Sequence, residues 1–77
     1  MKLRVSNSEE KDIVVILEPY ATEFTVKPGD YIEFVSDTEI PKDSHWLTES
    51  NQGNIIVWPE WEGGIVSTYD SAGNLID

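Results

Sequence analysis

The chain has 77 residues, of which 15 are Asp or Glu and five are Lys or Arg, so its formal net charge at pH 7 is -10. A negative field of this size repels phosphate backbones and anionic lipids, so we expect no direct nucleic-acid or membrane binding and a neutral or basic protein partner. The absence of Cys excludes disulfides and thiolate metal sites, which leaves the apolar core to stabilise the fold alone.

The chain length predicts one domain spanning residues 1–77. The longest apolar run, Ile13 to Leu17, is far shorter than the roughly 20 residues of a membrane-spanning helix. The first residues also lack the apolar stretch of a signal peptide. We therefore expect a cytoplasmic location, with which the absence of Cys agrees.

Turn-forming residues recur along the chain and separate short segments rich in β-branched and aromatic residues, without a sustained helical period. This pattern predicts an all-β fold, a small antiparallel sandwich or partly open barrel of about six or seven short strands. The expected strands, in chain order, are Lys2–Ser6, Ile13–Glu18, Thr22–Lys27, Tyr31–Ser36, Trp46–Ser50, Asn54–Trp58 and Ile65–Asp70, and Leu75–Asp77 is expected to add a short edge piece.

Two segments also predict how their strands are placed in the fold. The run Ile13–Leu17 is apolar at every position, which indicates a central strand covered on both faces. The sequence Lys27-Pro28-Gly29-Asp30 predicts a type II turn, because Pro presets φ and the following Gly tolerates a positive φ. This turn should join two antiparallel strands whose apolar residues, Phe24 and Val26 before it and Ile32 and Phe34 after it, face the core.

The segment from Val26 to Val35, with His45 downstream, resembles the strand-turn-strand that precedes the first copper His of cupredoxins. The resemblance covers roughly a quarter of the chain and implies a Greek-key sandwich. A blue-copper site needs two His and a Cys thiolate, and this chain has one His and no Cys. No copper site is therefore expected.

A second resemblance rests on Glu18-Pro19-Tyr20-Ala21-Thr22-Glu23, on Pro28-Gly29 and on Trp61-Glu62-Gly63. Together these residues are similar to the pattern E-P-W-x-x-E, P-G and W-x-G of a group of short uncharacterised bacterial proteins, with Tyr20 in place of the first Trp. The resemblance implies a bacterial source and no particular activity.

Residues for catalysis are scarce. The only His is His45, and the adjacent Ser44 would point to the opposite side of an extended chain. The acidic residues Asp37, Glu39 and Asp43 lack the spacing of a calcium-binding EF-hand loop. We therefore expect no catalytic residue, no metal ion and no cofactor, and thus a protein that is not an enzyme.

The aromatic residues provide the candidate binding site, because three Trp in a chain of this length is well above ordinary usage. Trp46 and Trp58 either fill the core or lie at the surface, and the same alternatives hold for Trp61. The candidate binding residues are Trp61, Trp58, Trp46, Tyr20, Glu60 and Glu62.

This set favours a protein-interaction module, because indole faces attract cations and nearby carboxylates form salt bridges with a basic partner. A carbohydrate-binding module, in which the Trp rings stack on sugars, is the alternative, and a nucleic-acid mimic is the third. Open sheet edges also allow a homodimer.

Overall fold

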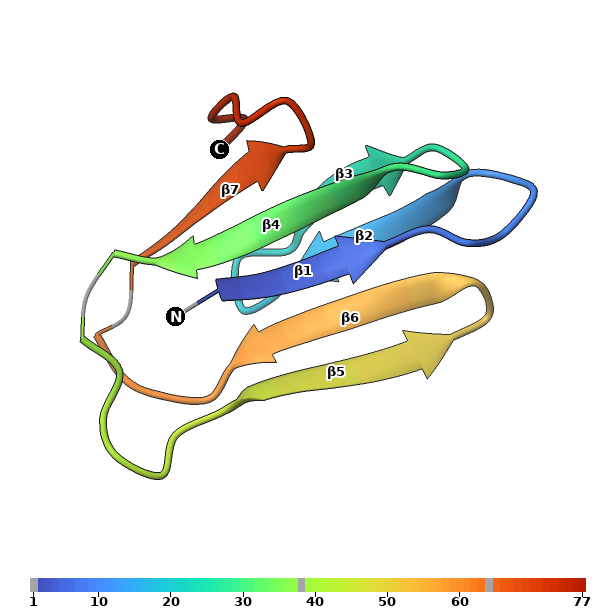
Figure 1. The fold of residues 1–77 in the computed structure, drawn as a ribbon. Coiled ribbons are helices and arrows are strands. Elements are labelled where there is room, and N and C mark those ends of the chain that lie inside the picture. Colours follow the sequence, from blue (N-terminus) through green and yellow to red (C-terminus); the bar gives the residue numbers. More distant parts are fainter. Residues whose placement is uncertain (1, 38, 64) are drawn as a thin grey trace.

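The computed structural model describes residues 2–37, 39–63 and 65–77. Their regular elements are all β-strands, arranged in two sheets of order β1-β4-β7 and β3-β2-β6-β5 that face one another (Figure 1). This confirms the prediction of a small all-β fold of seven strands, although the four-stranded sheet is mixed and not purely antiparallel, because β2 and β6 run parallel. In the described part of the chain no helix is long and apolar enough to cross a membrane. The strands are β1 Lys2–Ser6, β2 Ile13–Leu17, β3 Thr22–Val26, β4 Tyr31–Ser36, β5 Trp46–Asn51, β6 Asn54–Pro59 and β7 Val66–Asp70.

The predicted strands all form, and their ends differ from the prediction by a single residue at most. The expected edge piece at the C-terminus is a single bridge between Tyr69 and Leu75. The tail continues along β7, where the Thr68 N–H donates to the Asp77 carbonyl at 2.8 Å and the Ile76 N–H donates to the Thr68 carbonyl at 2.8 Å. The chain thus covers the outer edge of β7 with its own last residues.

The core lies between the sheets and takes side chains from both. Phe34 of β4 is fully buried and meets Phe24 of β3 edge to face, with ring centroids 5.8 Å apart. Such an aromatic pair adds to the stabilisation that burial alone supplies. The buried apolar residues are Val5, Ile13, Val15, Leu17, Val26, Ile32, Phe34 and Val57. The predicted core-facing assignment of Phe24, Val26, Ile32 and Phe34 is therefore confirmed.

The turn at Lys27–Asp30 forms as predicted, but it does not close a hairpin. The Asp30 N–H donates to the Lys27 carbonyl at 3.0 Å, and Gly29 has a φ of +78°. The two flanking strands run in opposite directions, but β3 pairs with β2 whereas β4 pairs with β1 and β7 (Figure 1). The turn therefore carries the chain from one sheet to the other, which places Val26 and Ile32 on facing sides of the core.

The prediction for β2 is half right. The strand is central, because it lies between β3 and the parallel strand β6. The expectation that both its faces are covered is wrong, since Val15 is fully buried whereas Val14 and Ile16 remain half-buried. Among the described strands, no second sheet lies over this face of β2, which therefore belongs to the molecular surface.

The loop between β1 and β2 is held by one buried polar residue, Asn7, which is 2% exposed. Its side-chain amide donates to the carbonyls of Lys11 and Val26 at 2.8 and 2.9 Å, and its side-chain oxygen accepts the Glu9 N–H at 2.8 Å. Its backbone N–H and carbonyl bond to the turn at Gly29 and Asp30. Asn7 thus joins the β1–β2 loop to the crossing between the sheets.

Candidate functional site

The outer face of the four-stranded sheet carries a row of apolar side chains that do not contribute to the core. Successive residues of a strand point to opposite faces. Because Val15 and Leu17 of β2 are buried, Val14 and Ile16 point outward. In β6 the buried residue is Val57, so Ile56 and Trp58 point outward as well.

The strand register brings these side chains together. Ile16 of β2 is level with Ile56 of β6, and Trp58 of β6 is level with Leu47 of β5. Leu47 is 38% exposed, which is high for a large aliphatic side chain within a sheet. We call the residues Val14, Ile16, Leu47, Ile56 and Trp58 the outer apolar patch.

Carboxylates border the outer apolar patch on both sides. On one side Ile16 pairs with Glu23 of the edge strand β3, and on the other Ile56 pairs with Glu49 of the edge strand β5. Glu18, which follows β2, donates its N–H to the Val57 carbonyl at 2.9 Å and so stays next to β6. The patch therefore has an apolar centre and an acidic border.

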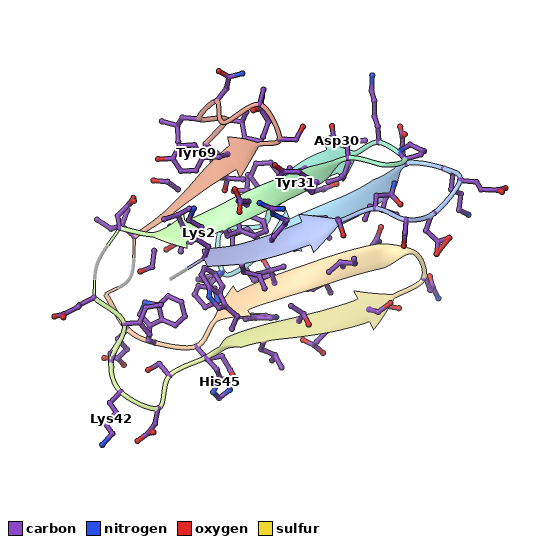
Figure 2. The ribbon with its side chains drawn as sticks, viewed as in Figure 1. Lys2, Asp30, Tyr31, Lys42, His45 and Tyr69 are labelled. Carbon is purple, nitrogen blue, oxygen red and sulfur yellow. The ribbon has the colours of Figure 1, made fainter. Side chains whose placement is uncertain are left out.

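The five basic residues of the chain lie elsewhere. Lys2 and Arg4 belong to β1, and the Arg4 guanidinium lies 4.1 Å from the centre of the Tyr31 ring and 3.3 Å from the Glu33 carboxylate. Figure 2 shows Lys2, Tyr31 and Tyr69 on the three-stranded sheet, with Lys42 in the loop before β5. Lys11 and Lys27 occupy the β1–β2 loop and the β3–β4 turn. Among the described residues, no Lys or Arg belongs to β2, β3, β5 or β6, the strands that form the outer face.

The candidate residues Trp46 and Trp61 form a pair on the other side of the sheet from Trp58. Their rings meet edge to face with centroids 4.9 Å apart, and the Trp46 ring lies 6.4 Å from Phe34. Both indole N–H groups are inaccessible to solvent and have no hydrogen-bond partner among the described residues. These two Trp side chains extend the core, whereas Trp58 lies on the outer apolar patch.

The candidate carboxylates next to Trp61 differ in their partners. Glu60 lies 2.7 Å from the Nε2 atom of His45, with both side chains partly exposed. The Glu60 N–H also donates to the His45 carbonyl at 3.1 Å, which fixes the entrance to β5 against the end of β6. Glu62 is exposed. The contacts of Glu60 with His45 thus join the end of β6 to the start of β5. They do not provide a free carboxylate beside the Trp61 indole.

Tyr20 lies on a different chain segment from the three Trp residues. It lies in the β2–β3 turn, after the cis peptide bond between Glu18 and Pro19, and is 55% exposed. Together with Ile65, which is 63% exposed, it borders a shallow hollow at the opposite edge of the sandwich. The candidate residues therefore fall into three places, and only Trp58 lies among several apolar neighbours on an open face.

Among residues 2–37, 39–63 and 65–77, no group of three or more His, Asp or Glu side chains is close enough together to hold a metal ion. No protein-family model, curated protein or solved structure matches the chain.

Four members of the outer apolar patch are not predicted as site residues from the sequence, namely Val14, Ile16, Leu47 and Ile56. The signal was present in the unbroken apolar run of β2, which was interpreted as burial on both faces. Leu47 gives no such signal, because the four residues that follow it in β5 are polar and only the register with Trp58 joins it to the patch.

Proposed function

We propose that the protein is a non-enzymatic interaction module that docks a basic protein on its outer apolar patch. The single observation that carries this proposal is the apolar row from Val14 to Leu47, bordered by Glu23 and Glu49 and free of Lys and Arg. The bacterial source implied by the Glu18–Glu23 resemblance and a cytoplasmic location belong to the same proposal.

The chemistry of the patch defines its partner. Docking an aliphatic surface on Ile16, Ile56 and Trp58 would remove apolar area from water, which is favourable at roughly 25 cal/mol per Å². Trp58 is the natural hot spot, because a large aromatic near the middle of an interface commonly dominates its binding energy. Glu23 and Glu49 would then meet Lys or Arg side chains at the border, where opposite charges accelerate association and exclude acidic competitors.

Other occupants fit this face less well. In a second copy docked through the same patch, the carboxylates of one molecule would approach those of the other, and each molecule carries a net charge of -10. A nucleic-acid mimic needs a continuous row of carboxylates, which the apolar centre interrupts. A sugar needs hydroxyl-binding groups around its stacking ring, whereas the register neighbour of Trp58 is Leu47.

Matched variants test the proposal. Ile56→Thr reduces the apolar surface of the patch on the inner strand β6, and Val35→Thr makes the same kind of change on β4, the central strand of the opposite sheet. Proteins captured from a lysate of the source organism should include a basic partner that binds the wild type and Val35→Thr equally. Ile56→Thr should reduce its recovery by about tenfold, consistent with the removal of buried apolar groups from an interface.

The proposal fails if Ile56→Thr and Val35→Thr retain the same proteins in equal amounts. A glycan array provides the competing outcome, since saturable binding of a sugar that is lost in Trp58→Ala would support the carbohydrate-binding alternative. Glu23→Gln combined with Glu49→Gln separates the two cases, because these changes should weaken a basic protein partner and make its binding less sensitive to salt.

A further inference from the structure

One sheet has three strands and the other has four. The additional strand, β5, extends beyond the edge of the three-stranded sheet that β1 forms. Tyr20 and Thr22 at the start of β3 border the same hollow as Ile65 and Val66 at the start of β7, so β7 lies over β3. At the other side of the sandwich, Ser6 at the end of β1 shares a cleft with Ser50 and Ile55. The three-stranded sheet therefore ends at β1, and β5 extends past it (Figure 1).

The burial of β5 agrees with this overhang. Thr48 pairs with Val57 and Ser50 pairs with Ile55, so both side chains point to the inner face of their sheet. Val57 is fully buried, yet Thr48 and Ser50 are exposed. In the described part of the chain, no strand covers the inner face of β5 at these positions. We call the residues Thr48 and Ser50 the β5 ledge, whereas Trp46 at the start of the strand is covered by Trp61.

The free edge of β1 faces the space above this ledge. The Asn7 N–H donates to the Asp30 carbonyl at 2.9 Å, which directs the backbone groups of Asn7 toward β4. Hydrogen-bonding direction alternates along a strand in an antiparallel ladder, so Leu3 and Val5 also bond to β4. The N–H and carbonyl groups of Arg4 and Ser6 then point to the open side of β1, where the sheet has no further strand.

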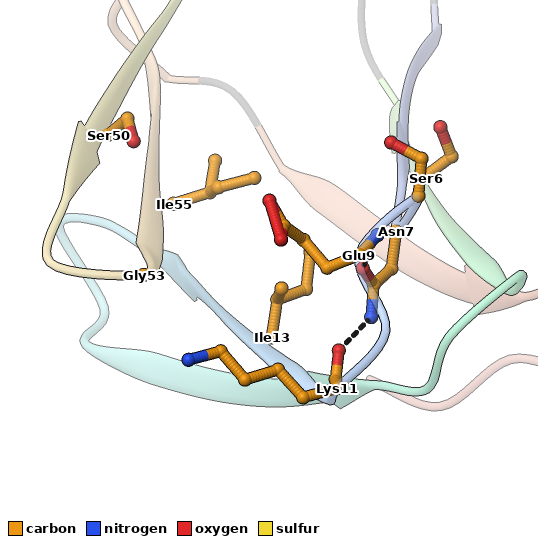
Figure 3. A pocket seen from close by; sticks show the side chains of 9 residues that line it. Ser6, Asn7, Glu9, Lys11, Ile13, Ser50, Gly53 and Ile55 are labelled. Atoms are coloured by element: carbon orange, nitrogen blue, oxygen red, sulfur yellow. Dashed lines mark hydrogen bonds between the residues drawn. The ribbon is translucent and has the colours of Figure 1, made fainter.

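A cleft of about 370 Å³ lies at the Ser6 end of the ledge. Figure 3 shows Ser50, Gly53 and Ile55 on one side of this cleft and Ser6, Asn7 and Glu9 on the other. Its lining includes the apolar side chains of Ile13 and Ile55. This volume accommodates an aliphatic side chain, and the apolar contacts lie next to the unpaired backbone of β1.

We propose that the β1 edge accepts an extended segment of another polypeptide chain, which pairs with Arg4 and Ser6 and lies over the β5 ledge. Strand addition of this kind gains affinity from main-chain hydrogen bonds and specificity from pockets for alternate side chains. One added strand would complete a sandwich of equal sheets, with an aliphatic residue in the cleft of Ile13 and Ile55. This surface is separate from the outer apolar patch, which lies on the opposite face of the four-stranded sheet.

The same geometry excludes pairing of β1 with β1 of a second copy. If β1 of another molecule paired with β1, the two three-stranded sheets would form one continuous sheet. The two four-stranded sheets would then lie edge to edge in the layer below it. The β5 strand of each molecule already projects beyond its own β1 by one strand spacing, about 4.8 Å. Both β5 strands would then require the same space, so the edge has room for a single strand only.

A phage-displayed library of random peptides, each about twelve residues long, provides the probe. Selection on the immobilised protein should yield sequences with apolar residues at alternate positions, and the strongest of them is synthesised. Amide hydrogen exchange measured by NMR should then slow by at least about tenfold at Arg4 and Ser6 when the peptide is bound, because new main-chain bonds protect those groups. Ser6→Pro removes one edge-facing N–H and should weaken binding by about tenfold, whereas Ser6→Ala should stay within about twofold.

N-methylation of alternate peptide amides gives a test that leaves the protein unchanged. Methylation of the amides that face β1 should abolish binding, and methylation of the intervening amides should leave it intact. The proposal is overturned if no peptide is selected, if both methylated series bind equally, or if protection appears at Ile16 and Ile56 in place of Arg4 and Ser6. This last outcome would leave the outer apolar patch as the only docking surface.

Discussion

At the scale of single residues, Asn7 joins separate chain segments, because its buried side chain makes three hydrogen bonds. Asn7→Ala leaves the carbonyls of Lys11 and Val26 without their donor. We expect the free energy of unfolding to fall by about 2 to 3 kcal/mol, the usual cost of unsatisfied buried groups. Urea denaturation measures this change, with the exposed Ser8→Ala as the control expected to stay within about 0.5 kcal/mol. A loss below about 1 kcal/mol for Asn7→Ala would contradict the role assigned to this residue.

Thr68 differs from Asn7, because its buried polar group is not satisfied by a hydrogen bond within the described part of the chain. Its side chain is fully buried, and its hydroxyl has no hydrogen-bond partner among the described residues. Thr68→Val replaces the hydroxyl by a methyl group of similar size, so we expect the free energy of unfolding to rise by about 1 kcal/mol. Thr68→Ser, which keeps the hydroxyl and loses the methyl group, should be destabilising. Thermal or urea unfolding separates the two variants, and a less stable Thr68→Val would show that the hydroxyl has a partner.

Asp30 is expected to make the free energy of unfolding depend on pH. Hydrogen bonds from the Ser71 hydroxyl and from the Tyr31 N–H hold the pKa of its carboxyl below the ordinary value of 3.8. A lowered pKa in the folded state stabilises the protein above the unfolded-state pKa, and this stabilisation is lost as the pH falls through the folded-state pKa. The free energy of unfolding should thus be larger for the wild type than for Asp30→Asn at neutral pH. This difference in unfolding free energy should become smaller below about pH 4. Unfolding free energies measured from pH 7 to pH 2 test this, and a constant difference would contradict it.

At the scale of elements, the edges of the three-stranded sheet differ. The C-terminal tail covers β7, with Thr68 bonded to Ile76 and Asp77, whereas β1 has no such cover. Deleting residues 74–77 should therefore speed amide exchange at Thr68 by about tenfold or more, because its N–H loses its acceptor. The Val15 amide in the central strand β2 is the internal control and should keep its protection. Unchanged exchange at Thr68 would show that the tail does not protect this edge.

The strands were predictable from the sequence, and their partners were not. Alternation and turn residues place β4 at Tyr31–Ser36 as observed, because both signals are local. The parallel pairing of Val14–Leu17 with Asn54–Val57 depends on contacts between segments far apart in the chain. The Lys27–Asp30 turn was predictable as a turn, but whether its strands pair or separate depends on the rest of the core.

The candidate site depends on the same non-local information. Trp58 was identified from composition, and Ile56 shares its face because the two are alternate residues of β6. Leu47 joins them only through the register of β5 and β6. The apolar run of β2 was interpreted as double burial, because sequence alone does not separate a covered strand face from an exposed patch. The β5 ledge required the sheet order, since Thr48 and Ser50 are ordinary polar strand residues in the sequence.

At the scale of the whole molecule, charge and apolar surface divide between the two faces of the sandwich. Lys2 and Arg4 lie on β1 of the three-stranded sheet, where Arg4 is held by Glu33 and Tyr31. The outer face of the four-stranded sheet combines the apolar patch with Glu23 and Glu49 and has no basic strand residue. This asymmetry is the central reason to expect a basic partner on that face.

The most direct test is an NMR map of the protein saturated with the basic partner recovered by capture. The methyl signals of Val14, Ile16, Leu47 and Ile56 and the indole signal of Trp58 are expected to shift or broaden together, and the changes should weaken as salt is raised. Changes confined to Val35 and Tyr69 on the opposite sheet, with the outer apolar patch unaffected, would contradict the proposed docking surface.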